Sequence, residues 1–142
     1  MKVSARTIIL ITLIAAGGSY MLFFTGGKSG SGTAARAIKI PALSSQAKKG
    51  EVVFNANCAA CHGKNAAGTD QGPPLIHNIY NPGHHADMAF YRAANMGTRQ
   101  HHWRFGDMPP QKQVSKDDVT LIIKYIREVQ RANGIVYQKH VM

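Results

Sequence analysis

The residues with the most specific spacing in this chain are Cys58, Cys61 and His62, in the run Cys-Ala-Ala-Cys-His. This spacing places both thiols within reach of the two vinyl groups of one haem, where they form thioether bonds. The adjacent imidazole then falls under the iron as its first axial ligand. The sequence therefore predicts one haem c per chain, bound covalently through Cys58 and Cys61, with His62 as a metal ligand.

Two other kinds of site use a similar cysteine spacing. A thiol–disulfide redox pair accompanies a βαβ pattern, which this chain lacks, and a histidine directly after the second cysteine is the haem form. A structural disulfide is the other alternative, because it is compatible with an exported domain. Two cysteines are too few for a disulfide framework or for a four-cysteine zinc or iron–sulfur site.

The second iron ligand must come from elsewhere in the chain, and the candidates are three methionines and the histidines after position 62. Met108 is the best candidate, because it precedes two prolines in a loop before the last predicted helix. Prolines remove backbone donors and restrict the chain, so a thioether there is held without a competing helix. We predict Met108 as the second metal ligand, and we expect Met88 and Met96 to be core residues of a helix.

Four further histidines occur as two adjacent pairs, His84-His85 and His101-His102. Such residues could bind copper or zinc. The alternative is that the first pair is the polar start of a helix and the second pair lies in a surface loop. Adjacent side chains in a loop point to opposite sides, so neither pair alone makes a good chelate. One of these histidines could also replace Met108 as an iron ligand.

Trp103, Arg104 and Arg99 lie just before the methionine loop. Haem propionates carry negative charge, and a buried propionate needs hydrogen-bond donors. The indole N–H of Trp103 and the guanidinium of an arginine are suitable donors, so we predict Trp103 and Arg104 as cofactor-binding residues. The alternative is that both arginines are solvated and Trp103 is an ordinary core residue.

Three helices are expected to position these residues, over about 45–58, 87–96 and 116–133. The last is the clearest, because apolar residues from Val119 to Val129 recur at helical spacing. The expected start and stop signals are Ser44 or Ser45, Asp87 with Gly97, and the Ser115–Asp118 capping box with Gly134. No stretch of any length alternates like a strand. The predicted fold class is all-α, with three or more helices packed around a covalent haem, because so small a core usually needs a cofactor.

Residues 1–27 are predicted to be a membrane anchor or a signal segment. Lys2 and Arg6 precede an uncharged run over 7–24, which as a helix spans about 27 Å and approaches the ~30 Å hydrocarbon core. The positive charges would keep the N-terminus in the cytoplasm. We favour an uncleaved transmembrane helix over a signal peptide cleaved near 15–18, because the apolar stretch continues past that point.

The rest of the chain is divided by composition and charge. Residues 28–45 are predicted to be a flexible tether rich in Gly and Ser, although 34–41 could lie along the domain surface, and 46–142 form the domain. Residues 1–50 carry seven Lys and Arg and no acid, whereas residues 51–142 carry ten against seven acids, which together make the net charge of +10. The domain has too little positive charge for a nucleic-acid partner.

The region over about 50–134 resembles class I, monohaem cytochrome c, of the membrane-anchored bacterial type. Gly50 and Phe54 stand eight and four residues before Cys58, as in the N-terminal helix of that family. Tyr125 and Ile126 stand where the family has an aromatic–aliphatic pair against that helix.

Two loop segments extend the resemblance. The run from Gly72 through Pro73 to Leu75 looks like the family's Gly-Pro-x-Leu segment. It implies that the Pro73 carbonyl accepts a hydrogen bond from Nδ1 of His62, and that Pro73 and Leu75 border the cofactor. The distal methionine of the family precedes a proline, as Met108 does.

The resemblance implies a one-electron carrier and not an enzyme, because two protein ligands would leave no iron position for a substrate. The expected partners are redox proteins and the membrane, with no nucleic acid and no small-molecule substrate. The expected location is the bacterial inner membrane, single-pass, with the haem domain in the periplasm, or the soluble periplasm after cleavage. The alternatives are a fixed haem-c subunit of a respiratory oxidase or dehydrogenase, and a haem ligand sensor or peroxidase.

Overall fold

The computed structural model describes residues 37–139, and their regular structure is helical. The elements are α2 (Ser45–Asn57), α3 (Ala59–His62), η1 (Lys64–Ala66), η2 (Asn78–Tyr80), α4 (Asp87–Met96) and α5 (Lys116–Ala132). Over this range extended backbone pairs only as an isolated antiparallel bridge between Thr98 and Met108, so the all-helical prediction is confirmed. The predicted anchor over 1–27 lies outside the described residues, and no helix within 37–139 is long and apolar enough to cross a membrane.

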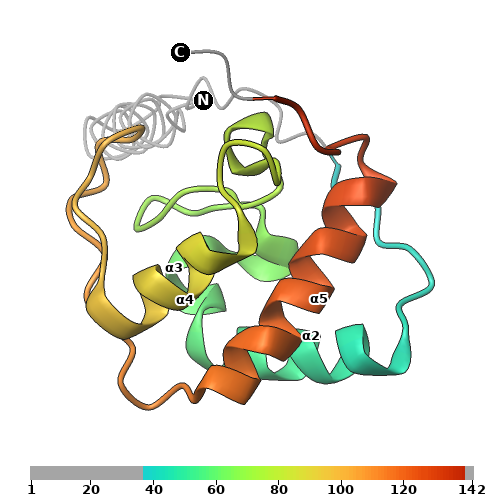
Figure 1. The fold of residues 1–142 in the computed structure, drawn as a ribbon, viewed down its shortest axis with the longest axis horizontal. Coiled ribbons are helices and arrows are strands. Elements are labelled where there is room, and N and C mark those ends of the chain that lie inside the picture. The colour runs from blue at the N-terminus through green and yellow to red at the C-terminus, as the bar shows by residue number, and fades with distance from the viewer. Residues whose placement is uncertain (1–36, 140–142) are drawn as a thin grey trace, which may run out of the picture. The chain divides into compact units, whose positions relative to one another are not determined.

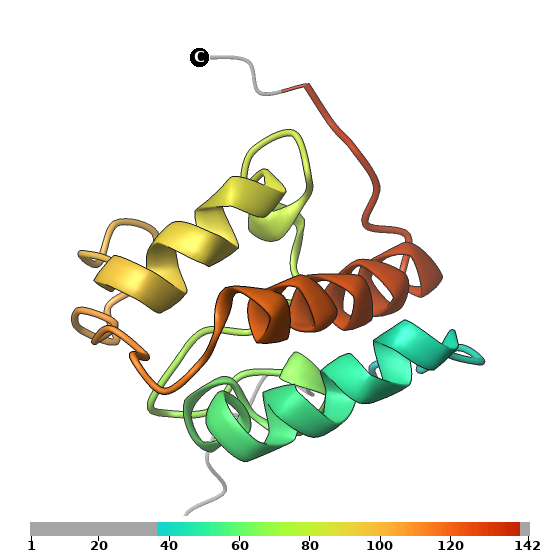
Figure 2. The ribbon, with the colours of Figure 1, turned by 60° about the horizontal axis from the view of Figure 1, so that its bottom comes forward.

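The centre of the domain is the crossing of α2 and α5, which lie side by side in Figures 1 and 2. Gly50 makes the close approach possible, because a Cβ atom built there would lie 2.0 Å from the Leu121 carbonyl oxygen. One turn further along α2, the buried Phe54 ring contacts the buried Tyr125 ring, with centroids 5.6 Å apart. The N-terminal and C-terminal helices of the domain therefore form one apolar interface.

The ends of α2 and α5 follow from side chains outside each helix. The Ser44 hydroxyl accepts a hydrogen bond from the Ala47 N–H at the start of α2. Ser115 and Asp118 form the predicted capping box at the start of α5. Gly134, at φ +77°, closes α5 by donating to the Arg131 carbonyl, the left-handed ending that glycine favours. The predicted bounds of both helices are correct to within one residue.

The predicted N-cap of α4 is wrong. Ala86 occupies the cap position, and Asp87 is the first residue of the helix. The Asp87 carboxylate instead accepts a hydrogen bond from Nε of the buried Arg127 at 2.9 Å. A buried guanidinium needs an ionic partner, and this need decides the role of Asp87. The other groups that accept from Arg127 are the carbonyls of Tyr80 and His85 and the Gln130 side chain.

The prediction of a flexible tether reaching residue 45 is wrong for the segment 38–44. The Lys39 N–H donates to Asn133 Oδ1 at 2.9 Å, and Asn133 Nδ2 donates back to the Lys39 carbonyl at 2.8 Å. The N–H and the hydroxyl of Ser44 both donate to the Glu128 carboxylate. Ile38 and Leu43 pack against the core, so this segment belongs to the globular unit. The alternative of a segment on the domain surface is correct for residues 38–41.

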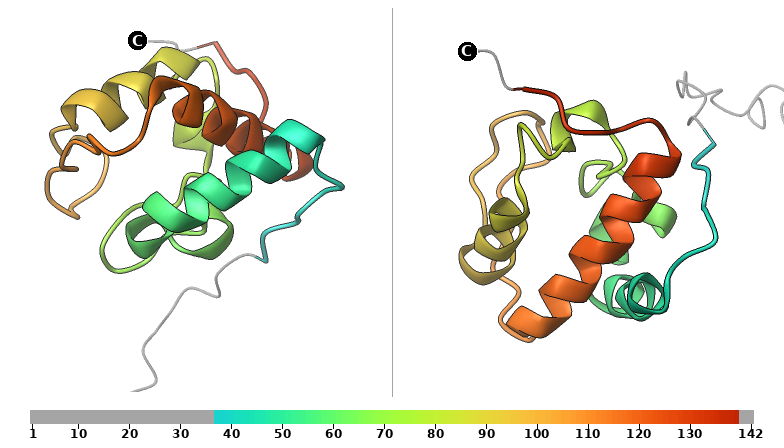
Figure 3. Two further views of the ribbon diagram at one scale, coloured as in Figure 1. Left: turned by 90° about the horizontal axis from the view of Figure 1, so that it is seen from below. Right: turned by 45° about the vertical axis from the view of Figure 1, so that its right-hand side comes forward.

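The expectation that Met88 and Met96 are core residues is also wrong, since they are 60% and 71% exposed. Helix α4 has no buried residue, because it lies at the edge of the domain (Figure 3). Its inward side carries small and aromatic residues, among them Phe90 and Ala93, and faces a cavity.

Candidate functional site

A cavity of about 580 Å³ opens between α3, α4 and the start of α5. The end of α2, residues 73–75, residues 80–86 and the loop over 98–114 supply the rest of its wall. Of the eight residues predicted to bind a cofactor, seven line this cavity: Cys58, Cys61, His62, Pro73, Leu75, Trp103 and Met108. Arg104 is exposed and does not line it. The tertiary structure thus brings residues from separate parts of the chain to one site.

The cysteine motif lies at the junction between the end of α2 and the single turn of α3. The Cys58 N–H donates to the Phe54 carbonyl at 2.8 Å, and the His62 N–H donates to the Cys58 carbonyl at 2.9 Å. Both cysteines are free thiols. Burial, with a smaller contribution from Cys61, raises the pKa of Cys58 to about 11. Reactive cysteines of disulfide-exchange sites have lowered pKa values, so the environment of Cys58 disfavours that alternative.

The His62 imidazole is held in one orientation by the loop that follows α3. Its Nδ1 lies 2.9 Å from the Pro73 carbonyl oxygen, the contact that the resemblance implies. A carbonyl only accepts, so Nδ1 carries the proton and Nε2 keeps its lone pair. Burial lowers the pKa of His62, and the hydrogen bond to Pro73 opposes this shift only in part. The side chain is therefore a neutral imidazole oriented as a metal ligand.

The loop that carries Met108 is fastened to the end of α4. Thr98 and Met108 exchange backbone hydrogen bonds of 3.0 and 2.9 Å, and the Gln111 N–H donates to the Ala94 carbonyl at 2.7 Å. Gly97, at φ +77°, permits this approach, because a Cβ there would lie 2.5 Å from the Met108 carbonyl oxygen. Met108 is half-buried and lines the same cavity as His62.

Trp103 presents a buried polar atom at the cavity. Its indole Nε1 has no hydrogen-bond partner, while its ring packs edge-on against His77 at 5.1 Å. Burial raises the pKa of Tyr80, and the nearby Trp103 side chain opposes this rise. The two groups nevertheless fall short of hydrogen-bond geometry, so the indole N–H remains available to a bound group.

These features fit a haem. Two free thiols, a neutral imidazole and a thioether line a cavity whose walls are mainly apolar, and a buried N–H without a partner is suited to a carboxylate. Further apolar side chains in the wall are Phe54, Phe90, Val114, Val119 and Ile122.

Sequence reasoning missed two features of the cavity wall. Arg92 and Arg99 line it, and Arg104 does not. Arg99 lies in the stretch that the sequence indicated, whereas no periodicity singles out Arg92. All four paired histidines also line it, although 15 residues separate the pairs in sequence. Only the loop geometry places them together.

Comparison with known proteins identifies a family. The family model described as Cytochrome c matches residues 47–130, more than half of the chain. The matched span contains all of the lining residues named above. A search of curated proteins found no match, and a search of solved structures found none either.

Proposed function

Because the chain belongs to the cytochrome c family, whose haem serves electron transfer, we propose that it is a one-electron carrier. The haem c would be bound through Cys58 and Cys61, with His62 and Met108 as axial ligands. The observation that carries the proposal is that these four side chains line one cavity, with His62 oriented by the Pro73 carbonyl.

The haem supplies reversible one-electron chemistry at its iron. The protein's part is to hold the ligands and to exclude water. Pro73 keeps His62 in one tautomer and one orientation. The pairing with Thr98 holds Met108 at the cavity, and its thioether together with the apolar walls would favour the reduced form of a bound haem. The Trp103 N–H would donate to a propionate, and Arg99 would balance its charge.

The exposed Cys61 supports electron exchange at the surface, since it indicates that the cavity reaches solvent beside the second thiol. We propose redox proteins as donor and acceptor, with no small-molecule substrate and no nucleic acid. The uncharged run over 7–24 after Lys2 and Arg6 supports a membrane anchor with the haem domain in the periplasm. An anchored carrier meets its partners at raised effective concentration.

The test of the ligand assignment is the absorption spectrum of full-length protein matured with haem. We expect a six-coordinate, low-spin haem whose ferric form shows the weak long-wavelength band of methionine–iron ligation. Met108→Ala should abolish this band. Met88→Ala and Met96→Ala are matched controls, because both side chains are exposed and absent from the cavity wall, and they should retain it.

An unchanged spectrum in Met108→Ala would refute the axial assignment. Rapid carbon monoxide binding by the unaltered protein would refute the carrier function and indicate a ligand sensor or peroxidase. Recovery of the haem only within a stable larger complex would indicate a fixed subunit.

A further inference from the structure

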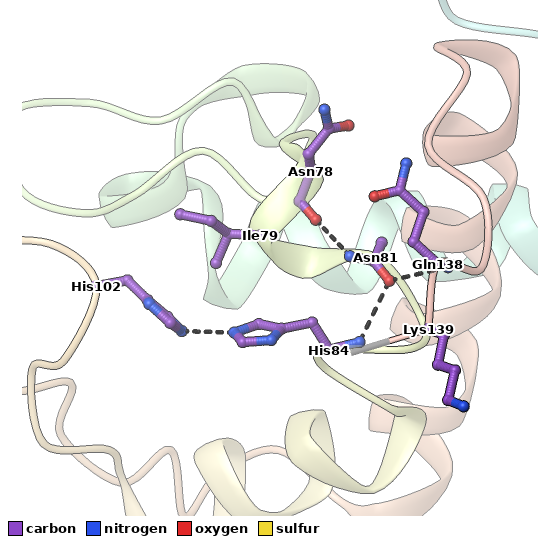
Figure 4. Close-up of a pocket in the computed structure, with 7 residues that line it drawn as sticks. All are labelled: Asn78, Ile79, Asn81, His84, His102, Gln138 and Lys139. Carbon is purple, nitrogen blue, oxygen red and sulfur yellow. Dashed lines mark hydrogen bonds between the residues drawn. The ribbon is translucent and has the colours of Figure 1, made fainter. Parts of the chain in front are cut away.

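The two histidine pairs converge at the edge of the haem cavity. Nε2 of His84 lies 3.0 Å from Nε2 of His102, and the two rings point toward each other at the wall of a pocket (Figure 4). One ligand atom from each of His84, His85 and His102 lies within 4.8 Å of the other two. Neither pair alone is expected to chelate a metal, but residues from both pairs together lie close enough to share one ion.

A hydrogen bond to the backbone prepares His85 as a ligand. Its Nδ1 lies 2.8 Å from the Ile79 carbonyl oxygen, so Nδ1 carries the proton and Nε2 keeps its lone pair. Metal-binding histidines are commonly oriented in this way. The Ile79 carbonyl thus orients His85 in the same way as the Pro73 carbonyl orients His62.

Burial and the neighbouring rings both act on His85. Burial lowers the pKa of His85, and the nearby His84, His102 and His101 lower it further despite the hydrogen bond to Ile79. The His84 and His102 rings lie 4.9 Å apart between centroids, and the His85 and His102 rings lie 5.2 Å apart. Neutral imidazole is the form that binds a metal.

The separation between His84 and His102 suits a shared ion. Two nitrogens bound at about 2.0–2.1 Å, with an angle of about 90–110° at the metal, lie roughly 2.8–3.4 Å apart. The observed 3.0 Å falls within this range, so an ion could replace the contact between the two nitrogens once each ring turns to direct its lone pair at the metal. The third ligand atom, from His85, lies within 4.8 Å of the other two.

An access path reaches the cluster from outside the haem cavity. A second pocket, of about 390 Å³, is lined by His84 and His102 on one side and by polar residues on the other. Figure 4 shows Asn78, Asn81 and Gln138 around it. His84 and His102 line both this pocket and the haem cavity, so an ion could reach them without passing the haem.

We propose that His84, His85 and His102 form a binding site for one copper ion, distinct from the haem ligands. The ligand set is three imidazoles with no carboxylate, and Lys139 lines the outer pocket. Such a site does not offset the charge of a hard cation, and nitrogen ligands bind Cu²⁺ more tightly than the other divalent first-row ions. This inference goes beyond electron transfer and does not depend on it.

The test is a titration of the haem-loaded, full-length protein with Cu²⁺ against a chelator of known affinity. We expect one tightly bound copper per haem, and an electron paramagnetic resonance spectrum with splitting from nitrogen ligands. His84→Ala and His102→Ala should each weaken binding at least about tenfold, as loss of a ligand or of its support does. His102 is exposed, so its variant tests the site with little risk to folding.

His77→Asn is the matched control, because His77 lies outside the cluster and asparagine Oδ1 stands where His77 Nδ1 accepts from the Ile79 N–H. It should bind copper like the unaltered protein. Copper binding that is absent, or that survives both alanine variants, would overturn the proposal. Stoichiometric Zn²⁺ binding without Cu²⁺ binding would overturn the choice of copper. A changed haem spectrum in His102→Ala would show that the histidine serves the haem instead.

Discussion

Two buried polar atoms in the described part of the chain lack hydrogen-bond partners: Nε1 of Trp103 and the hydroxyl of Tyr125. Their surroundings differ. Trp103 lines the haem cavity, where a propionate would complete its bonding, whereas Tyr125 does not line that cavity and packs against Phe54 in the helix crossing. Burial, and then the charge of Glu51, raise the pKa of Tyr125 to about 12. The Tyr125 hydroxyl is therefore neutral at physiological pH and costs stability.

We expect Tyr125→Phe to stabilise the domain by about 1 kcal/mol, because it removes a buried hydroxyl that has no partner and keeps the ring. Denaturant unfolding of the haem-loaded protein measures the change. Tyr91→Phe is the control, since the Tyr91 hydroxyl lies 2.8 Å from Thr120 Oγ1 at the surface and its loss should destabilise slightly. A clear loss of stability in Tyr125→Phe would show that its hydroxyl is hydrogen-bonded.

At the scale of elements, the crossing of α2 and α5 depends on the absence of a side chain at position 50. The atoms that a Cβ there would meet belong to the backbone of Leu121 and Ile122, so no rotamer change relieves the overlap. Because Cys58 follows directly on α2, a shift of α2 would also move the first haem attachment point.

Gly50→Ala is expected to destabilise the domain by at least about 2 kcal/mol, because the helices must separate. Alanine is otherwise the better helix former by roughly 1 kcal/mol, so destabilisation isolates the effect of the crossing. Asn55→Ala, at an exposed position of the same helix, should be neutral or stabilising. Thermal unfolding followed by circular dichroism compares the two. Equal stability of Gly50→Ala and the unaltered protein would contradict this packing.

At the scale of the whole domain, the core lies on one side of the cofactor cavity and α4 on the other. The buried cluster centres on α2, α5 and the loop through Leu75 and Ile76, while α4 contributes no buried residue. A group bound in the cavity would add packing partners for α4 and the Met108 loop. A ligand that binds only the folded state adds its binding free energy to stability.

We expect the Cys58→Ser, Cys61→Ser double variant, which cannot hold haem covalently, to unfold at least about 10 °C below the haem-loaded protein or without a cooperative transition. Differential scanning calorimetry of the two proteins makes the comparison. An equally cooperative transition at the same temperature would mean that the polypeptide core suffices.

The local features of this protein were predictable from sequence because they depend on near neighbours. The Cys58–His62 spacing, the Ser115 capping box and the glycine that ends α5 each act over a few residues. The helices follow from the apolar periodicity between such end signals. The Pro73 contact with His62 followed from resemblance to a family.

What only the tertiary structure decided depends on residues far apart in the chain. Asp87 pairs with Arg127 and does not cap α4, because α5 buries the Arg127 guanidinium beside the start of α4. Residues 38–44 belong to the domain and not to the expected tether, because hydrogen bonds to Asn133 and Glu128 hold them there. The two histidine pairs meet because loops on either side of α4 return to one cavity edge. Periodicity and composition indicate which residues a segment buries. They do not indicate which distant segment packs against it, because packing and the pairing of buried charges decide that contact.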